Sequence, residues 1–289
     1  MKGLLIVNNF VYAAKFSELY DLLCNSAKRL GICLEIKKTG DIPHNIDYVN
    51  NEQYDFILFW DKDTVLANMF ELCGYRVFNS SNAIMNCDNK AYTAVLLQKA
   101  NVRTPRTFIA PLTFEGLGYN DLTFANSISD ILGYPMIIKE LYGSFGQQVY
   151  LVNNTDEMKA IIAKLGHKGF LMQEYIESSR GRDIRINVVG DKAISSMLRY
   201  NEHGDFRSNI SNGGSMKKYD INDEQRKAAI DACKALKMDF AGVDVMFGKH
   251  GEPIICEVNS NPHFKSTLQC TGADMSFEIL SYIKSEMLK

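Results

Sequence analysis

Two carboxylates and one amide near the carboxyl-terminal end of the chain have the chemistry of a metal site: Asp244, Glu257 and Asn259. Glu257 and Asn259 are two residues apart on an expected strand, so their side chains face the same side of it. If the two apolar runs around these residues pair as a hairpin, Asp244 falls opposite Glu257. Two carboxylates ~4 Å apart repel by about 4 kcal/mol at an effective dielectric near ~20, and a divalent cation removes that conflict.

The ligand chemistry of this group predicts a hard cation. Oxygen ligands without histidine or cysteine are typical of such ions, and a site with few protein ligands leaves room for water and phosphate oxygens. We therefore expect Mg²⁺, or Mn²⁺ in its place. The alternative is that the three side chains form an ordinary solvated face of the hairpin.

A second group of residues has the chemistry of an anion site. The tip Gly143-Ser144-Phe145-Gly146 is expected between two strands, and Lys139 lies on the strand that leads into it. Glycines let backbone N–H groups approach an anion, and an ammonium is costly to bury without an anionic partner. Tight hairpin turns require glycine in any case, so the tip alone leaves both interpretations open. The loop lacks G-x-x-x-x-G-K-[ST], which excludes a P-loop.

Three further short segments carry polar groups: Glu174-Tyr175-Ile176, Asp183-Ile184-Arg185 and Arg207-Ser208-Asn209. Each one alone is explained as charge at a strand end or as a turn. Their order along the chain and their spacing are what make them informative.

The elements that must position these residues fall into two groups. In the first ~85 residues, short apolar runs alternate with helical patterns, which is typical of a small α/β layer with a parallel sheet. The runs are 4–7, 13–30, 34–37, 56–60 and 65–72. No G-x-G-x-x-G follows the first strand, so we expect a scaffold that supplies one wall of a substrate cleft rather than a dinucleotide site.

After this layer the pattern changes to short strands, hairpins and isolated helices. Strands are expected over 136–139, 148–152, 170–176, 183–189, 193–198, 241–247 and 253–258. Helices are expected over 84–101, 124–132, 155–165 with Thr155 as its cap, 222–238 with Asn222 as its cap, and 277–288.

Composition excludes several classes of partner. The 32 basic and 34 acidic residues leave a net charge of −2, so no overall field attracts nucleic acid or an anionic membrane. The first apolar run is too short for a signal peptide or a membrane span. Seven scattered cysteines without a C-x-x-C pair indicate a reducing cytoplasm and no zinc site. The sequence leaves a homo-oligomer open.

Eight segments in order along the chain resemble the RimK-type glutamate ligase family of the ATP-grasp superfamily. They are Asp88-Asn89-Lys90, Pro135-Met136-Ile137-Ile138-Lys139, Gly143-Ser144-Phe145-Gly146, Gln173-Glu174-Tyr175-Ile176, Gly181-Arg182-Asp183-Ile184-Arg185, Asp205-Phe206-Arg207-Ser208-Asn209, Ala241-Gly242-Val243-Asp244 and Glu257-Val258-Asn259. The resemblance runs from about Asp88 to the end of the chain.

The resemblance implies a mixed α/β and α+β fold, in which an ATP-grasp fold follows a small amino-terminal α/β domain. The implied domains are 1–86, 87–170 with the glycine-rich loop, and 171–289 with the metal site. ATP is then gripped between the last two domains.

The resemblance also implies roles for individual residues. Contacts with ATP are implied for Lys90, Lys139, Gly143, Ser144, Phe145, Gly146, Glu174, Tyr175, Ile176, Asp183, Arg207, Ser208 and Asn209. Within this set the lysines meet the phosphates, and the segment from Glu174 to Ile176 holds the adenine. Catalysis is assigned to Arg207 and Asn209, metal binding to Asp244, Glu257 and Asn259, and substrate binding to Arg185, Arg199 and His263.

The chain departs from the family pattern in three places. Ser260-Asn261-Pro262-His263-Phe264 stands where the ribosomal-protein-modifying members resemble Asn-Ala-Ser-Pro-Gly, so an imidazole and a phenyl ring are expected to line the substrate cleft. Gln147-Gln148 follows the glycine tip where another glycine is usual. The amino-terminal domain matches poorly, so these departures concern the substrate more than ATP.

The leading hypothesis is an ATP- and Mg²⁺-dependent carboxylate–amine ligase that works through an acyl phosphate. Its partners would be a carboxylate and an amine, on a small molecule or a peptide, with glutamate as a candidate amino acid. Cations and a metal ion suit this reaction, since they neutralise charge as the γ-phosphoryl group moves. The alternatives are a kinase that stops at phosphoryl transfer and a nucleotide-binding protein without catalysis.

Overall fold

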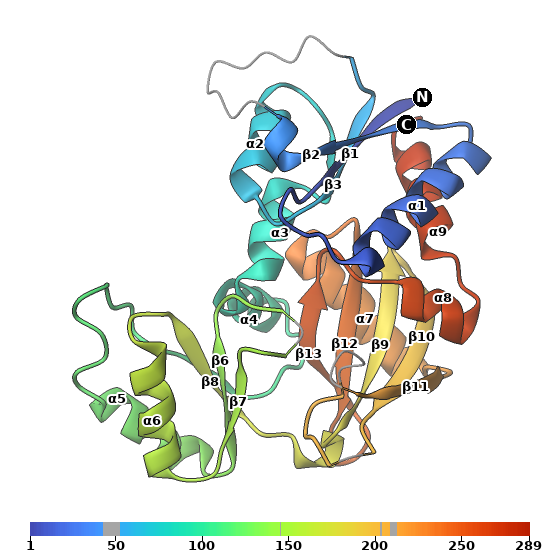
Figure 1. Cartoon of the computed structure of the whole chain (residues 1–289). Helices are drawn as coiled ribbons and strands as arrows, with labels where there is room; N and C mark the ends of the chain where they lie inside the picture. Colours follow the sequence, from blue (N-terminus) through green and yellow to red (C-terminus); the bar gives the residue numbers. More distant parts are fainter. Residues whose placement is uncertain (43–52, 145, 203, 209–212) are drawn as a thin grey trace.

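The structure is a computed structural model, and it describes residues 1–42, 53–144, 146–202, 204–208 and 213–289. The described residues form three β-sheets, each at the centre of a separate part of the molecule (Figure 1). Mixed α/β architecture was expected from the sequence and is confirmed. The amino-terminal parallel sheet and the two hairpins are confirmed as well.

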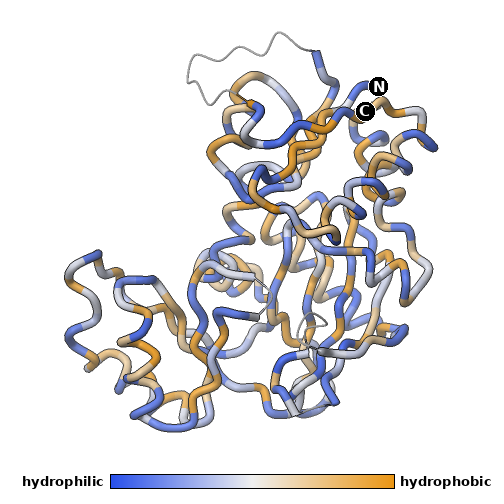
Figure 2. The backbone as a smooth tube through the Cα atoms, viewed as in Figure 1, coloured by the Kyte–Doolittle hydropathy of each residue, from blue (hydrophilic) through white to orange (hydrophobic). Residues whose placement is uncertain are grey.

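The amino-terminal part is a parallel sheet of four strands in the order β2-β1-β3-β4. Its elements are β1 (Lys2–Val7), α1 (Ala14–Arg29), β2 (Cys33–Lys38), η1 (Thr39–Asp41), β3 (Phe56–Trp60), α2 (Thr64–Leu72), β4 (Val77–Phe78) and α3 (Ser81–Asp88). All five residues of β3 are buried, which is typical of a parallel sheet covered on both faces. Figure 2 shows its strands as a hydrophobic centre.

The central part is an antiparallel sheet in the order β5-β8-β6-β7. Its elements are α4 (Lys90–Lys99), β5 (Thr107–Ile109), α5 (Thr123–Leu132), β6 (Met136–Glu140), β7 (Val149–Val152), α6 (Thr155–Leu165) and β8 (Phe170–Glu174). Helices α5 and α6 cover one face of the sheet through a core that includes Met136, Ile162 and Phe170. The opposite face of this sheet borders the candidate active site described below.

The carboxyl-terminal part is an antiparallel sheet in the order β11-β10-β9-β12-β13. Its elements are η2 (Glu177–Ser179), β9 (Arg182–Val189), β10 (Lys192–Tyr200), β11 (Ser215–Lys218), α7 (Asp223–Leu236), β12 (Phe240–Phe247), β13 (Pro253–Asn259), α8 (Lys265–Thr271) and α9 (Met275–Glu286). Helix α7 packs on one face of the sheet through small residues such as Ala229 and Ala232.

The two ends of the chain meet. Helix α9 packs against α1, and the Ser26 and Ser276 hydroxyls lie 2.8 Å apart in the buried contact. At the edge of this contact, Arg29 pairs with Asp274 at 2.6 Å. The carboxyl-terminal helices therefore join the amino-terminal sheet to the rest of the molecule (Figure 1).

Two expected helix details are wrong. The single helix expected over 84–101 is two helices, α3 and α4, because the Asn89 side chain turns back to accept hydrogen bonds from the N–H groups of Ala91 and Tyr92 at the start of α4. Helix α6 is capped by Asn154 rather than by Thr155, through a 2.9 Å bond from the Glu157 N–H. The expected cap Asn222 on α7 is confirmed.

The position of β8 bears on the division of the chain. Strand β8 pairs with β5 and β6, so it lies in the central sheet although it runs past residue 170, where the resemblance placed a boundary. We propose that the central domain extends through Glu174, and that the carboxyl-terminal domain begins at the segment that follows.

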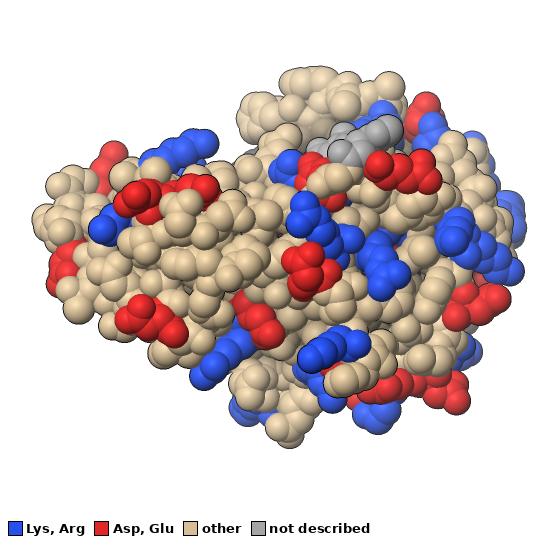
Figure 3. Space-filling view, turned by 90° about the horizontal axis from the view of Figure 1, so that it is seen from below, with Lys and Arg blue, Asp and Glu red and all other residues tan. Residues whose placement is uncertain are grey.

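Surface charge and helix hydrophobicity both bear on the expectations from composition. Basic and acidic side chains are interspersed on the face shown in Figure 3, as a net charge of −2 suggests. In the described part of the chain, no helix has both the length and the apolar character needed to cross a membrane.

Candidate active site

The glycine loop lies at the tip of the β6–β7 hairpin, as expected. Gly146 has φ +70°, a left-handed conformation that glycine adopts without strain. A Cβ on Gly143 would lie 2.4 Å from Gln148 Oε1, and the same amide oxygen accepts from the Ser144 N–H at 3.2 Å. Gln148, one of the departures from the family pattern, therefore packs against the loop itself. Phe145 lies outside the described residues.

Lys139 points out of the central sheet toward the carboxyl-terminal sheet. Its side chain is buried, with 8% of the residue exposed, and the contact of its ammonium is the Cys256 sulfur at 3.8 Å. Burial raises the pKa of Cys256 against the opposing effect of Lys139, so the thiol stays neutral. Among the described residues no carboxylate lies within ion-pair distance of Lys139, so the site has a buried positive charge that an anionic ligand would neutralise.

Lys90 lies between the glycine loop and the expected metal site. Its ammonium is 3.3 Å from the Gly143 carbonyl oxygen and 3.7 Å from Glu257 Oε1. It begins α4, directly after the Asn89 cap that ends the preceding helix. A single lysine thus connects the loop on the central sheet with a carboxylate on β13.

The segment after β8 leaves two backbone donors open. The Glu174 N–H donates to the Arg106 carbonyl at 2.9 Å, whereas the N–H groups of Tyr175 and Ile176 have no hydrogen-bond partner in the described part of the chain. All three residues line a cavity of about 110 Å³ together with Lys139, Asp183 and Arg207. Open backbone donors beside apolar walls suit a flat heterocycle with acceptor atoms.

The floor of the site is a row of charged side chains across the carboxyl-terminal sheet. Asp244 on β12 lies opposite Glu257 on β13 and opposite Arg185 on β9, so all three share one face. The register between Asp244 and Glu257 agrees with the sequence-based expectation. Arg185 holds Asp244 with two hydrogen bonds, the one from Nη2 to Oδ2 at 3.0 Å.

A second arginine ties this row to Asp183. Arg199 Nη2 lies 2.9 Å from Asp244 Oδ2 and 2.6 Å from Asp183 Oδ2. Burial acts to raise the pKa of Asp244, but the two arginines outweigh it and hold that pKa below its usual range. The expected repulsion between Asp244 and Glu257 is therefore relieved by protein cations on both sides, Arg185 and Arg199 on one and Lys90 on the other.

The three expected metal ligands offer the oxygen atoms that a hard cation takes, and in this structure both oxygens of Asp244 accept from arginines. The Asn259 amide nitrogen faces the Gly242 carbonyl at 3.4 Å, which turns the amide oxygen away from that contact. The described residues contain no cluster of three or more His, Cys, Asp and Glu side chains with metal-site geometry. Two carboxylates and one amide leave most of a six-ligand shell to water and phosphate, which is how proteins bind Mg²⁺.

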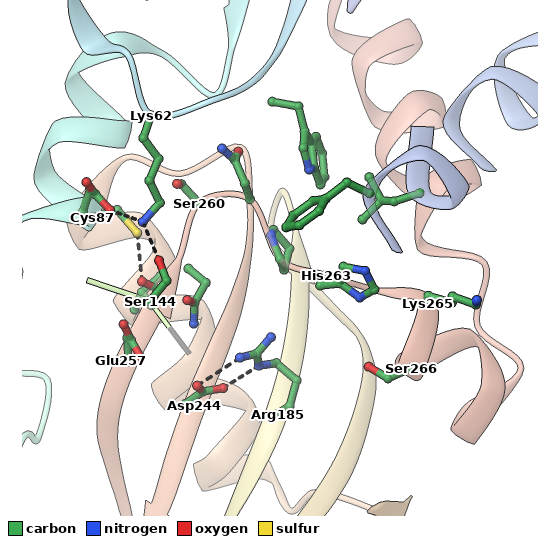
Figure 4. Close-up of a pocket in the computed structure, with 18 of the residues that line it drawn as sticks. Lys62, Cys87, Ser144, Arg185, Asp244, Glu257, Ser260, His263, Lys265 and Ser266 are labelled. Carbon is green, nitrogen blue, oxygen red and sulfur yellow. Dashed lines mark hydrogen bonds and ion pairs between the residues drawn. The ribbon is translucent and has the colours of Figure 1, made fainter. Parts of the chain in front are cut away.

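A larger cavity of about 580 Å³ lies between the carboxyl-terminal sheet and the amino-terminal part (Figure 4). Its floor includes Arg185, Asp244 and Glu257, and its far wall includes His263 and Lys265. This cavity and the 110 Å³ cavity share four lining residues: Lys90, Arg199, Asp244 and Glu257. These four residues, which carry two positive and two negative charges, form the border between the two spaces.

Arg207 lines the 110 Å³ cavity, on one side of this border. Its Nη1 donates to the Gly146 carbonyl at 3.0 Å, and Asp205 holds the other edge of the guanidinium. Ser208 beside it is buried. Asn209 lies outside the described residues.

The two rings expected to line the substrate cleft lie in different surroundings. His263 lines the larger cavity, whereas Phe264 is 1% exposed and packs edge-on against Trp60 with ring centres 5.7 Å apart. The expectation for Phe264 is therefore wrong, because that side chain turns into the core shared by α1, α9 and the amino-terminal sheet.

Sequence reasoning missed the residues that the amino-terminal part contributes. Lys62 lies two residues after the end of β3, pairs with Asp88 and lies 3.4 Å from the Ser144 hydroxyl of the glycine loop. Lys15 and Phe16, from the first turn of α1, complete the far wall. The signal for Lys62 was its place at the carboxyl end of a parallel strand, where ligands of α/β folds gather.

Comparison with known proteins identifies the family of the chain. A family model described as a RimK-like ATP-grasp domain matches residues 87–283. The chain is 33% identical over 267 residues to an uncharacterized MG012 homolog of Mycoplasma pneumoniae, covering 91% of this chain and 92% of that protein. It is 34% identical over 223 residues to a probable alpha-L-glutamate ligase of Vibrio vulnificus, covering 76% of this chain and 71% of that protein.

Solved structures show the same fold. A RimK domain ATP-grasp protein of Sphaerobacter thermophilus superposes with a TM-score of 0.74 at 17% identity, covering 98% of this chain and 99% of that one. D-alanine–D-alanine ligase of Bacillus anthracis, complexed with ATP, superposes with a TM-score of 0.74 at 18% identity, covering 100% of this chain and 97% of that one.

Proposed function

The chain belongs to the RimK-like ATP-grasp family and as a member is an ATP-dependent carboxylate–amine ligase; we propose that it joins an amino acid, with glutamate as the first candidate, to a small molecule or peptide. Glutamate is suggested by the relatives named probable alpha-L-glutamate ligase. The bond formed is an amide, and the energy comes from cleavage of ATP to ADP and phosphate.

One observation carries the proposal. The cavity beside the open Tyr175 and Ile176 donors and the larger polar cavity meet at a single border, where Lys90 and Arg199 face Asp244 and Glu257. A nucleotide in the first space would present its phosphates to the border, and a carboxylate in the second would reach it from the other side. Phosphoryl transfer requires this meeting of an anionic donor and an anionic acceptor among cations.

Each proposed residue has a defined task. Lys139, Lys90 and the loop N–H groups bind the phosphates, and the segment from Glu174 to Ile176 holds the base. Asp244, Glu257 and Asn259 would hold Mg²⁺, which supplies charge neutralisation at the phosphates when bound. Arg185 donates to Asp244 from Nε and Nη2, and its Nη1 has no hydrogen-bond partner in the described part of the chain, so it remains for a substrate carboxylate.

The reaction has two steps. A substrate carboxylate oxygen takes the γ-phosphoryl group of ATP, and ADP leaves. The amine nitrogen then attacks the acyl carbon, the bond from that carbon to the phosphate oxygen breaks, and phosphate leaves with the electron pair. Because two negatively charged reactants must approach each other in the first step, the cations at the border lower its barrier most.

The test is to incubate the purified protein with ATP, Mg²⁺, hydroxylamine and a panel of carboxylic acids. We expect a hydroxamate and ADP in equal amounts with the true carboxylate substrate. Replacing hydroxylamine by amino acids should then identify the amine through amide formation. A stable phosphorylated product without hydroxamate would show that the protein is a kinase instead. Failure of every carboxylic acid in the panel to support ADP formation would contradict the ligase function.

A further inference from the structure

His263 lies on the loop between β13 and α8, in the far wall of the larger cavity, and is positioned by the opposite end of the chain. Its Nε2 lies 3.0 Å from the Lys15 carbonyl oxygen, and the Phe16 ring meets the imidazole edge-on at 6.1 Å. In Figure 4 the ring lies between Arg185 and Lys265. Both contacts come from the first turn of α1.

These contacts determine which nitrogen carries the proton. A carbonyl oxygen only accepts hydrogen bonds, so Nε2 must donate, and the neutral ring then has its lone pair on Nδ1. Nδ1 has no hydrogen-bond partner among the described residues, and it is not one of the fully buried unpartnered atoms. The ring therefore presents a solvent-accessible proton acceptor in the wall of the cavity.

Burial and, after it, two neighbouring ammonium groups keep the His263 ring neutral. Burial comes first in lowering the pKa of His263, and the ammonium groups of Lys15 on α1 and Lys265 on α8 lower it further. Glu18, which pairs with Lys265, and the hydrogen bond to Lys15 act in the opposite direction without reversing the result. At neutral pH the lone pair on Nδ1 is therefore available.

The loop that carries His263 lies over the charged row. Pro262 Cβ and Arg185 Nη1 lie 2.9 and 3.0 Å from the place that a Cβ on Gly242 would take. Gly242 thus allows the residue before His263 to approach the guanidinium that binds Asp244. His263 and Arg185 therefore line the same cavity, in which the carboxylate substrate would lie.

The carboxylates that line the same cavity are already engaged. Asp244 is held by Arg185 and Arg199, Glu257 lies 3.7 Å from Lys90, and Asp88 is paired with Lys62. Among the described lining residues, Cys87 and His263 are neutral titratable groups. The buried Cys87 thiol donates to the Val258 carbonyl, whereas His263 has an accessible acceptor atom without a partner. An amine substrate is an ammonium ion at neutral pH, so it must lose a proton before its nitrogen can attack the acyl carbon.

We propose that His263 is a catalytic residue of the amide-forming step, an inference that rests on the proposed function. In this step, His263 Nδ1 removes a proton from the ammonium group of the amine substrate. The amine nitrogen then uses its freed electron pair to form the bond to the acyl carbon. A second proton leaves the nitrogen as the bond to phosphate oxygen breaks, and the departing phosphate takes it up. The imidazolium returns its proton to solvent after the product leaves.

The variant to test is His263→Gln, because a glutamine amide can still donate to the Lys15 carbonyl while it offers no proton acceptor of comparable strength. Two nucleophiles separate the roles: hydroxylamine, which is largely unprotonated at neutral pH, and the true amine substrate. We expect kcat for amide formation to fall about a hundredfold at pH 7, and hydroxamate formation to remain within a few-fold of the wild-type rate.

The pH profile supplies a second readout. In the wild type, amide formation should be lost as the pH falls through the lowered pKa of His263, and should change little above it. In His263→Gln the rate should rise about tenfold per pH unit as the free amine becomes more abundant. His167→Gln, which changes an exposed histidine, is the matched control and should match the wild type in both assays.

Each result has a clear consequence. If His263→Gln loses hydroxamate and amide formation equally, the residue only shapes the cavity and the proposal is overturned. Full amide formation with an unchanged pH profile would also overturn it. Absence of hydroxamate from the wild type would instead contradict the ligase function itself, so the two failures are distinguishable.

Discussion

Arg207 donates a hydrogen bond of 3.0 Å to the carbonyl oxygen of Gly146, so the loop after β10 touches the glycine loop of the central sheet. The other edge of its guanidinium is held by Asp205. The hydrogen bond from the Arg207 side chain, with the Arg207 N–H and charge, keeps the pKa of that carboxyl low against the opposing effect of burial. A bound nucleotide would compete with Gly146 for this arginine. The contact thus connects the carboxyl-terminal part with the glycine loop of the central part.

Arg207→Ala should leave ATP binding largely intact and slow the chemistry. If the guanidinium acts on the transferring phosphoryl group, its contacts strengthen in the transition state, and kcat should fall roughly a hundredfold to a thousandfold with little change in KM for ATP. Hydroxamate formation is the measurement, and Arg226→Ala on the exposed face of α7 is the control. A variant that traps hydroxamate at the wild-type rate would exclude this role.

Glu257→Gln should raise the Mg²⁺ concentration needed for ATP turnover. The substitution removes a charged oxygen ligand beside Asp244 but keeps the size of the side chain, and Lys90 then loses its carboxylate partner at 3.7 Å. A Mg²⁺ titration of ADP formation checks this, and chelator should abolish activity of the wild type. Glu115→Gln, in an exposed loop, serves as control. Wild-type turnover by Glu257→Gln at ordinary Mg²⁺ would argue against the metal site.

Lys139→Met should weaken ATP binding without harming the fold. A charge-assisted contact with phosphate is worth roughly 1.5–3 kcal/mol, or about tenfold to a hundredfold in affinity. Because the buried ammonium has no described carboxylate within ion-pair distance, an apolar chain of similar length should keep or raise the melting temperature. Calorimetry with ATP and thermal unfolding measure the two effects, and Lys159→Met on exposed α6 is the control. Unchanged ATP affinity would refute the phosphate contact.

The stability of the protein should depend on Asp239, which lies where the amino-terminal sheet meets α9. Burial raises the pKa of Asp239 to about 6, although Arg76 and Tyr282 both bond to its carboxylate. The folded pKa lies above the unfolded value of about 3.9, so the stability from this group is complete below about pH 4 and is lost as the pH rises through about 6.

The variant Asp239→Asn separates this effect from other titrations. Two pKa units correspond to about 3 kcal/mol at most. The difference in free energy of unfolding, variant minus wild type, should therefore increase by up to that amount from pH 4 to pH 7. Urea unfolding at several pH values measures the difference, with Asp130→Asn on exposed α5 as the control. A difference that does not change with pH would show that the carboxyl is ionised throughout.

Several features of the site could be predicted because they depend on local rules. Alternation along strands and the shortness of a hairpin place Asp244 opposite Glu257, and the observed register agrees. The glycine tip between β6 and β7 followed from the same reasoning. The break at Asn89 was missed because the apolar pattern of α3 runs on into α4, whereas the backbone follows the asparagine cap.

The sequence by itself determined the order of the motifs, the hairpins that carry them and the chemical nature of the residues at their tips. Only the tertiary structure decided that Arg185 and Arg199 hold Asp244, since strand order places β9 beside β12 and leaves no trace in local pattern. The same holds for His263 and Lys15, which lie 248 residues apart. Contacts of this kind depend on how the packed cores of separate parts bring distant segments together, and a local period along the chain contains no information on that packing.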